Sequence, residues 1–266
     1  MQSTKCTVGT ERAVADAIRA ARERREPIAP IRGALGDRNI QAAYRVQALN
    51  AEAWCRTGHR RPGRKVGLTS TAVQQQLGVD RPDSGVLFDT MAIDNGGTVT
   101  ASACMQPKVE AEVAFLIGHT LDRDYLRDSP LEEAVACAYP AIEICDSAIA
   151  RWQIGIVDTI ADNASSGFYV LGGPGATLAE FDLLGCKMRM EINGAVASVG
   201  VGRACLGSPM RALRWLAETS ASLEDPIRAG EVVLSGALGP MATVAPGDRV
   251  EAEIEGLGTA RVTFGG

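Results

Sequence analysis

The most constraining feature of this sequence is an apolar stretch from Gln106 to Ile117 that carries two glutamates two residues apart. Its valines, isoleucine and phenylalanine are typical of a β-strand. Side chains at positions i and i+2 of a strand point to the same face, so Glu110 and Glu112 converge. Two carboxylates that close repel each other, and an apolar setting also removes their hydration. The pattern therefore calls for a positive group between them, and a hard divalent cation is the natural candidate.

A second acidic pair, near the C-terminus, provides an internal control. Residues 250–256 alternate between apolar and acidic residues before a glycine, as an antiparallel strand with one solvated face does. Arg249 and Arg261 lie close by as ion-pair partners. We therefore predict that Glu251 and Glu253 are exposed to solvent.

The first pair differs from the second in the residues on its C-terminal side. From Val113 to Ile117 every residue is apolar, so neither face of the predicted strand is polar there. This indicates a strand that enters a core. Glu-x-Glu is also common on solvated strand faces, so the residues alone leave two alternatives for Glu110 and Glu112: a metal site or a solvated surface.

Composition excludes several classes of function. The chain has 266 residues, of which 46% are hydrophobic and 22% charged, as in an ordinary globular protein. Its net charge is −5 and only 5% of its residues are aromatic, so we expect no nucleic-acid partner. No apolar run approaches the ~20 residues that span a bilayer, and the N-terminus leads into a charged segment. We therefore expect no membrane partner.

Cysteine and histidine usage narrows the chemistry further. The seven cysteines are scattered and include no Cys-x-x-Cys pair, which is typical of free thiols in a reducing cytoplasm. The two histidines, His59 and His119, each follow a glycine in a predicted turn, and no Gly-x-Ser-x-Gly motif accompanies them. We therefore expect a cytoplasmic protein whose chemistry depends on carboxylates, lysine and hydroxyls, with or without a cation.

The hydrophobic periodicity predicts an α+β chain, with a small helical N-terminal part (residues 1–62) on a larger β-rich body (residues 63–266). In the N-terminal part we predict a helix capped by Thr10 that ends near Arg25. A second helix is expected over residues 38–56, after a loop. The two parts are expected to be distinct because strand signals dominate only the second.

Turn and capping signals divide the body. We predict a helix from Ser70 to Gly78, a loop over residues 79–85, a helix over residues 129–138, a hairpin turn at Asn193-Gly194 and a last helix over residues 208–223. Apolar runs predict strands over residues 141–144, 231–235, 249–255 and 259–264.

Three further features carry candidate chemistry. Lys65 precedes an apolar residue, a glycine and a helix start, which indicates a lysine that enters the structure and acts as a base or orients an anion. Asp83 lies between Pro82 and Ser84, where aspartate commonly stabilises a turn. Residues 158–167 are dense in small polar side chains, which either line a site or cap a loop.

Seven short segments follow one another along the chain in an order typical of one family. They are residues 63–70, 74–79, 82–85, 106–112, 140–143, 157–167 and 235–241. Together they resemble the hydratase/decarboxylase branch of the fumarylacetoacetate hydrolase superfamily, and most closely its 2-oxopent-4-enoate (2-hydroxypentadienoate) hydratases. The resemblance extends over nearly the whole chain from about Pro27, and it implies a body of mixed, rolled sheets.

The resemblance also implies the roles of individual residues. It implies that Glu110, Glu112 and Glu143 bind Mg²⁺ or Mn²⁺, which adds a third acid to the pair on the strand. A set of three carboxylates leaves positions open for water and for a chelating 2-oxo acid.

By the same resemblance, Lys65 and Asp83 are catalytic and Ser165 binds the substrate. The implied reaction is that of a hydro-lyase, which adds water to a 2-hydroxy-2,4-dienoate and gives a 4-hydroxy-2-oxo acid. Such a step belongs to bacterial catabolism of aromatic rings after meta-cleavage. The chain departs from the family by lacking an arginine in the stretch Cys145–Ile149, so the far end of the substrate is not specified.

Three alternatives to the hydratase stay open at this point. The nearest is a 4-oxalocrotonate-type 2-oxo-3-enedioate decarboxylase that uses the same metal. A hydrolase of acylpyruvates would need a well-placed histidine, and an inactive partner subunit would bind no metal. The resemblance further implies a homo-oligomer, pentameric or decameric, with edge strands between Arg249 and Phe264, and a complex with a partner enzyme of the pathway.

Overall fold

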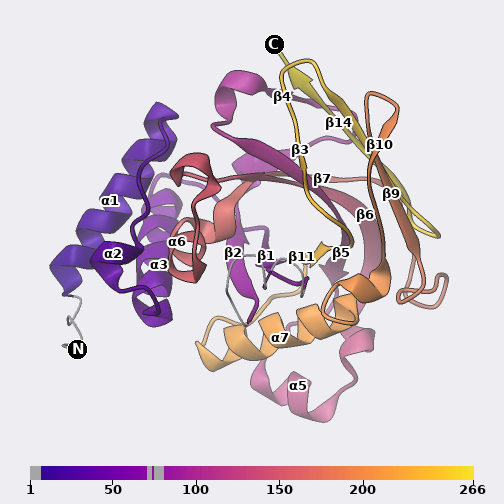
Figure 1. The fold of residues 1–266 in the computed structure, drawn as a ribbon. Coiled ribbons are helices and arrows are strands. Elements are labelled where there is room, and N and C mark those ends of the chain that lie inside the picture. The colour runs from indigo at the N-terminus through magenta and orange to yellow at the C-terminus, as the bar shows by residue number, and fades with distance from the viewer. Residues whose placement is uncertain (1–6, 71–73, 75–80) are drawn as a thin grey trace.

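Two curved β-sheets form the body of the protein, and helices from the N-terminal part lie beside them (Figure 1). This computed structural model describes residues 7–70, 74 and 81–266. The predicted α+β class, with a small helical N-terminal part and a β-rich body of mixed, curled sheets, is confirmed. In the part of the chain described, no helix is long and apolar enough to cross a membrane.

The larger sheet has the strand order β2-β1-β11-β5-β6-β7-β3, and β12 pairs with β5. Its strands are β1 (Gly63–Gly67), β2 (Asp83–Leu87), β3 (Ala92–Ile93), β5 (Pro107–Ile117), β6 (Val135–Asp146), β7 (Ser166–Leu171), β11 (Val232–Ala237) and β12 (Ala242–Thr243). The β1–β11 and β3–β7 pairs are parallel and the other pairs are antiparallel. The sheet is therefore mixed, and a late strand, β11, lies near its centre.

The smaller sheet has the order β10-β9-β13-β14-β4, and β8 pairs with β14. Its strands are β4 (Thr98–Thr100), β8 (Gly173–Pro174), β9 (Lys187–Ile192), β10 (Ala195–Val201), β13 (Arg249–Ile254) and β14 (Gly258–Gly265). The hairpin predicted at Asn193-Gly194 is confirmed, because both residues have positive φ (54° and 80°) between β9 and β10. The expectation of edge strands over residues 249–264 is wrong: β13 and β14 are interior, and β10 and β4 are the edges.

Alternation along β5 explains how the two sheets pack. Val109, Ala111, Val113 and Phe115 all belong to one buried cluster with the apolar side chains of β13. Residues at even positions, including Glu110, point to the opposite face of the larger sheet. One face of β5 therefore closes the core between the sheets, and the other is free to build a site.

The N-terminal helices are α1 (Val8–Arg24), α2 (Arg32–Leu35) and α3 (Ile40–Arg56), and they share a buried cluster with α6 (Ile156–Ala161). Thr7, rather than the predicted Thr10, caps α1: its extended backbone lets its hydroxyl accept from the Thr10 N–H. The stretch predicted as a plain loop contains α2.

One buried ion pair fixes α1 against the body. The Arg22 guanidinium on α1 lies 2.6 Å from Asp162, and it also donates to the backbone oxygens of Asp146 and Ser166. The helices are thereby anchored to the segment directly after α6.

Two local predictions in the body fail. The helix expected over residues 129–138 is only a 3-10 turn, Leu131–Ala134, preceded by α5 (Arg123–Asp128). From Val135 onward β6 pairs with β5, so tertiary pairing overrides the local capping signal and Pro140 lies within a strand. Asp83 begins β2 rather than lying in a loop.

Other local predictions are confirmed. The last helix, α7 (Pro209–Ser222), begins at its Ser208 cap and packs against β11 and α5. The predicted strands near residues 231–235, 249–255 and 259–264 are present as β11, β13 and β14. The helix predicted from Ser70 to Gly78 lies mostly outside the described residues.

Candidate active site

A cavity of about 500 Å³ opens on the face of the larger sheet that carries Glu110. Its inner wall is made of buried or half-buried polar side chains: Lys65, Asp83, Glu110, Cys145, Thr159 and Ser165. Its outer wall includes Lys108, Arg151, Trp152, Pro240 and Met241. The cavity thus joins residues that lie up to 176 positions apart along the chain, from Lys65 to Met241.

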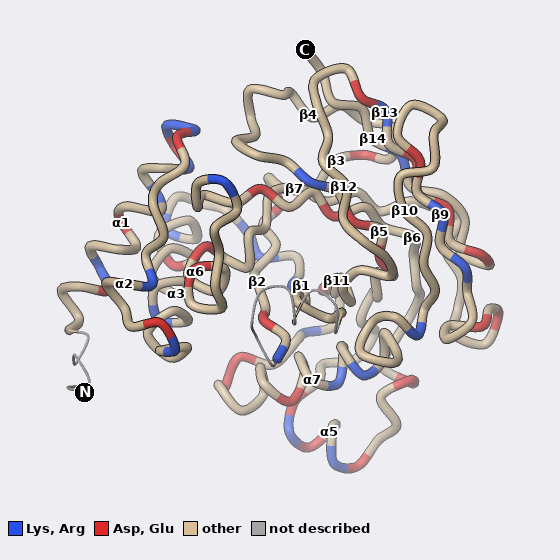
Figure 2. The backbone as a smooth tube through the Cα atoms, in the orientation of Figure 1, with Lys and Arg blue, Asp and Glu red and all other residues tan. Residues whose placement is uncertain are grey.

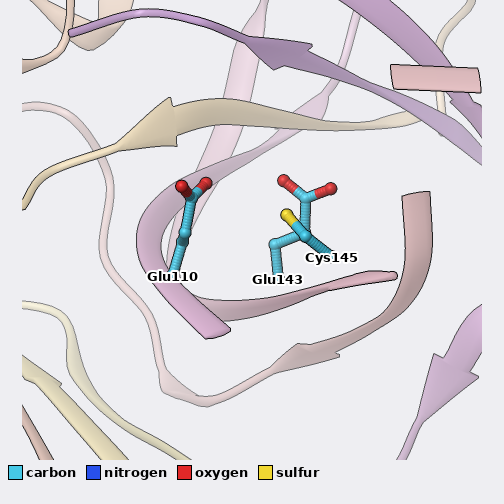
Figure 3. Close-up of side chains that lie close together, drawn as sticks. All are labelled: Glu110, Glu143 and Cys145. Carbon is cyan, nitrogen blue, oxygen red and sulfur yellow. The ribbon is translucent and has the colours of Figure 1, made fainter. Parts of the chain in front are cut away.

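Strand register places three ligand-type side chains together. Glu110 on β5 lies directly opposite Glu143 on β6, and Lys108 lies opposite Cys145. Since all four side chains point to one face, Glu110, Glu143 and Cys145 converge (Figure 3). One ligand atom from each of these three lies within 4.8 Å of the other two. The predicted pairing of Glu110 with Glu143 in one site is therefore present, and a thiol joins it.

Glu112 lies deeper than this group and has no exposed surface. Its Oε2 accepts the backbone N–H of Gly236 at 2.7 Å, and its Oε1 has no hydrogen-bond partner in residues 7–70, 74 and 81–266. Gly236 has φ +107°, and a Cβ there would lie 2.3 Å from the Thr69 side chain. Glycine therefore permits the bend in β11 that aims this N–H at Glu112.

The carboxylates of this group destabilise one another's charged forms. Burial, and then the charge of Glu143, raise the pKa of Glu110 from 4.5 to about 7. The same two causes, with Glu110 added, raise the pKa of Glu112 well above its usual value. Among the described residues, Glu112 Oε1 and Glu143 Oε2 are buried without a hydrogen-bond partner. Unpartnered, mutually repelling carboxylate oxygens fit a hard divalent cation.

Lys65 supplies the positive charge nearest to Glu143. Its Nζ lies 3.0 Å from Glu143 Oε1, and both side chains are almost fully buried, with exposures of 4% and 1%. Burial lowers the pKa of Lys65, but Glu143, Cys145 and Asp83 oppose this and together raise it well above its usual value. The side chain is therefore held as an ammonium, which can donate a proton or bind an anion.

Asp83 lies beside Lys65 because Gly67 has no side chain that would occupy the space between them. A Cβ on Gly67 would lie 2.2 Å from Asp83 Oδ1 and 3.2 Å from Lys65 Nζ. Asp83 Oδ2 accepts from Thr159 Oγ1 at 3.0 Å, while Oδ1 has no hydrogen-bond partner among the residues that the structure describes. Burial raises the pKa of Asp83, and the nearby Lys65 opposes that shift. The turn aspartate of the sequence is thus a buried acid in the cavity wall.

The polar segment after α6 lines the cavity through a strained backbone. Asn163, Ala164 and Ser165 have φ of 55°, 52° and 53°, which is uncommon for residues other than glycine. The Asn163 amide holds this conformation by bonding both the N–H and the C=O of Val86 at 2.8 Å. Ser165 Oγ is buried in the cavity wall, and no described residue forms a hydrogen bond with it. It is therefore available to a ligand.

Several lining residues were missed by sequence reasoning. Cys145 comes two residues after Glu143 on one strand, so the same i+2 rule that paired Glu110 with Glu112 would have found it. Lys108 Nζ lies 4.5 Å from the centre of the Trp152 ring at the cavity's outer wall. No local signal identifies Trp152, because a left-handed turn with φ of 53° brings it there.

Some residues that drew attention in the sequence lie outside the site. Asp146 accepts the backbone N–H groups of Met105 and Gln106, so it stabilises a loop and does not line the cavity. His59 lies near Asp89, and His119 stacks on Tyr125. Neither histidine lines the cavity, which leaves no histidine for a water-activating role there.

Comparison with known proteins agrees with this geometry. The family described as "Fumarylacetoacetate (FAA) hydrolase C-terminal" matches residues 57–264. The 2-keto-4-pentenoate hydratase 2 of Dechloromonas aromatica is 48% identical over 252 residues, covering 95% of this chain and 96% of the relative. The TodF product hydratase of Pseudomonas putida is 47% identical over 256 residues, covering 96% of each chain.

Solved structures give the same result. A 4-oxalocrotonate decarboxylase from Pseudomonas putida G7, complexed with magnesium and adipate, superposes with a TM-score of 0.91 at 32% identity. The match covers 97% of this chain and 98% of that one. The chain therefore belongs to the fumarylacetoacetate hydrolase family, in the group that contains the 2-keto-4-pentenoate hydratases.

Proposed function

We propose that this chain is a metal-dependent hydro-lyase that adds water to a 2-hydroxy-2,4-dienoate of the 2-oxopent-4-enoate type. The product is a 4-hydroxy-2-oxo acid, formed in the catabolism of aromatic rings after meta-cleavage. The observation that carries the proposal is the buried Lys65 ammonium, 3.0 Å from Glu143, beside carboxylate oxygens that have no hydrogen-bond partner within the described part of the chain. Relatives at 47–48% identity that are named hydratases support it.

Glu110, Glu112 and Glu143 fit a divalent cation, and we assign Mg²⁺ or Mn²⁺ to them because all three offer hard oxygen donors. When bound, the ion supplies Lewis-acid polarisation of the substrate carboxylate and 2-oxygen. Magnesium is present in the solved decarboxylase structure at 32% identity, which supports a divalent ion in this pocket.

The remaining chemistry is proton transfer by groups of the cavity wall. Lys65 Nζ, held as an ammonium, transfers a proton to C5 of the diene, while the proton of the 2-hydroxyl passes to Asp83. The resulting 2-oxo-3-enoate takes up water, with the hydroxyl group bonding to C4 and the proton to C3. Asp83, whose Oδ1 has no hydrogen-bond partner among the described residues, orients the Lys65 ammonium and returns the proton to Lys65. Ser165 Oγ binds the substrate and limits its rotation.

Product analysis by NMR tests the proposal. The purified chain, Mg²⁺ or Mn²⁺ and fresh 2-hydroxypenta-2,4-dienoate should give 4-hydroxy-2-oxopentanoate, and EDTA should abolish the signal. Lys65→Met should remove the activity, whereas Lys187→Met should keep it because Lys187 is exposed on β9. Unchanged dienoate in the presence of either metal would refute the proposed reaction.

A decarboxylase acting on 4-oxalocrotonate is the second candidate. It is favoured by the TM-score of 0.91 to such an enzyme and by Lys108 and Arg151 in the outer wall, which suit a second carboxylate. The higher identity to hydratases places it second. Release of CO₂ from 4-oxalocrotonate, without hydration of the dienoate, would reverse this order.

We also propose that the chain forms a homo-oligomer, pentameric or decameric, that binds a partner enzyme of the same pathway. The edge strand β10 exposes Val196 and Val199, with exposed fractions of 50% and 61%, and this apolar edge supports self-association. Light scattering of the purified chain measures the mass of the assembly, and a monomeric mass would exclude this part of the proposal.

A further inference from the structure

We propose that the pocket holds a second, overlapping cation site for thiophilic divalent ions, with Zn²⁺ as the biological example. Its ligands are Glu110, Glu143 and Cys145. The inference rests on the proposed function in one respect only, namely that a cation lies between Glu110 and Glu143. The assignment of Cys145 as a ligand does not depend on the proposed function, because the set of three carboxylates does not include a sulfur.

The strand register makes this ligand set possible. Cys145 lies two residues after Glu143 on β6, and it faces Lys108 across the ladder, next to Glu110. The ligand atoms of Glu110, Glu143 and Cys145 lie within 4.8 Å of one another. In a tetrahedral zinc site with bonds of about 2.0–2.3 Å, ligand atoms lie roughly 3–4 Å apart. Because Glu110 is only half-buried, its side chain has room to rotate toward the other two ligands when an ion binds.

Two members of this set are buried and offer a ligand atom to an ion. Glu143 is 1% exposed; its Oε1 lies 3.0 Å from Lys65 Nζ, and among the described residues its Oε2 has no hydrogen-bond partner. Cys145 is 4% exposed and lines the cavity. By contrast, one of the two oxygens of Glu112 already accepts the Gly236 N–H, and among the described residues Glu112 is outside the group whose ligand atoms lie within 4.8 Å of one another. The thiol therefore replaces Glu112 as the third ligand when the ion prefers sulfur.

Ligand chemistry separates the two sites. Mg²⁺ takes oxygen ligands, whereas Zn²⁺ and Cd²⁺ bind thiolate strongly. When the Cys145 sulfur coordinates as thiolate, its proton leaves to solvent. Because both ligand sets contain Glu110 and Glu143, a thiophilic ion and Mg²⁺ exclude each other. We therefore expect Zn²⁺ to compete with the ion that supports turnover.

The other thiols of the described residues give no such group. Of the six free cysteines there, Cys145 alone joins two carboxylates within ligand distance of each other. Cys186, for example, is buried in the core between the sheets, and its thiol contacts the backbone oxygen of Leu183. It provides a matched control, being a buried free cysteine outside the cavity.

Cadmium titration of the full chain tests the inference, because thiolate-to-Cd²⁺ charge transfer gives an ultraviolet absorption band. The wild type and Cys186→Ser should show the same band. Cys145→Ser should lose it and bind Cd²⁺ at least about 10-fold more weakly, the lower end of the loss seen even for outer-shell partners. An undiminished band in Cys145→Ser, or no band in the wild type, would overturn the proposal.

A competition experiment keeps the test valid if Cys145→Ser folds poorly. Excess Mg²⁺ added to the Cd²⁺-loaded wild type should bleach the band, and a band that persists at saturating Mg²⁺ would disprove the overlap. Neither readout uses substrate. Failure of dienoate hydration with an intact cadmium band would therefore refute the proposed reaction alone, and the converse would refute the sulfur ligand alone.

Discussion

The two Glu-x-Glu pairs of this chain share a local pattern and lie in opposite environments. Glu112 on β5 has no exposed surface and Glu110 lines the cavity, whereas Glu251 and Glu253 on β13 are exposed. Figure 2 shows acidic positions both on β5 and β6, within the molecule, and on β9 and β13 of the smaller sheet. Both β5 and β13 are interior to their sheets, so the position of the strand within its sheet does not cause the difference in exposure.

The difference arises from the segments that cover each acidic face. In the described part of the chain no layer covers the outward face of β13, and Glu251 there pairs with Arg261 at 2.7 Å with both side chains about half exposed. The acidic face of β5 is enclosed by segments from elsewhere in the chain, including β1, residues 163–165 and the loop at Pro240. A strand pattern fixes which side chains share a face, and distant segments decide whether that face is dry.

The largest difference between the two pairs is expected in catalytic activity when one glutamate of each pair is replaced. Glu110→Gln should lower kcat/KM by about 1000-fold or more, because a Lewis-acid ion contributes several kcal/mol to the transition state. Glu251→Gln should leave kcat/KM unchanged. Steady-state kinetics with Mg²⁺ measures both, and full activity in Glu110→Gln would invalidate the ligand assignment.

The next largest effect is expected from removing Lys65, the cation that faces Glu143. Lys65→Met should lower kcat by about 100-fold or more through loss of proton transfer. It should also destabilise the fold by about 3 kcal/mol, because Glu143 loses its buried partner. Urea unfolding measures the second effect. A variant that is inactive yet fully stable would show that Lys65 does not compensate Glu143.

The pH dependence of stability should distinguish the pairs by a few kcal/mol at most. Burial and Glu143 raise the pKa of Glu110 from 4.5 to about 7, so the folded state binds the extra proton between these values. Its contribution to the free energy of unfolding is complete below pH 4.5 and is lost as pH rises through about 7. Unfolding in EDTA at several pH values should show this decline in the wild type and a flatter curve in Glu110→Gln.

The smallest effect is expected at the exposed pair. Arg261→Met should change the free energy of unfolding by less than about 1 kcal/mol, since Arg261 and Glu251 are half exposed and screened by salt. Thermal melting at low and high salt measures it. A loss as large as that of Lys65→Met would show that the two acidic faces are not as different as their exposure indicates.

The sequence predicted the exposed pair fully and the buried pair in part. The apolar run after Glu112 correctly indicated a core strand. It could not supply Glu143 as a ligand, because the register that sets Glu110 against Glu143 joins residues 33 positions apart in sequence; only the family resemblance gave Glu143 that role. The local pattern already indicated a chemical role for Lys65, whereas only the resemblance assigned roles to Asp83 and Ser165, and the cavity brings these three residues together.

Errors occurred where long-range pairing outweighs local signals. The capping signal at Ser129 predicted a helix, but pairing with β5 makes residues from Val135 onward a strand. Trp152 reaches the cavity through a left-handed turn that no local pattern predicts. The strain at Asn163 is also invisible in the sequence, because the partner that maintains it is the backbone of Val86.

The central position of β11 has a consequence for how the protein is made. Residues 232–237 separate β1 from β5 in the sheet, yet they leave the ribosome long after both. Until they emerge, β1 and β5 have no shared neighbour and their edges stay unpaired, which makes such a nascent chain prone to aggregation. Until then, Glu112 also lacks the hydrogen bond that it accepts from the Gly236 N–H in the folded protein. The acidic pocket is therefore completed late in synthesis. The exposed strand edges need protection by chaperones most just before β11 emerges.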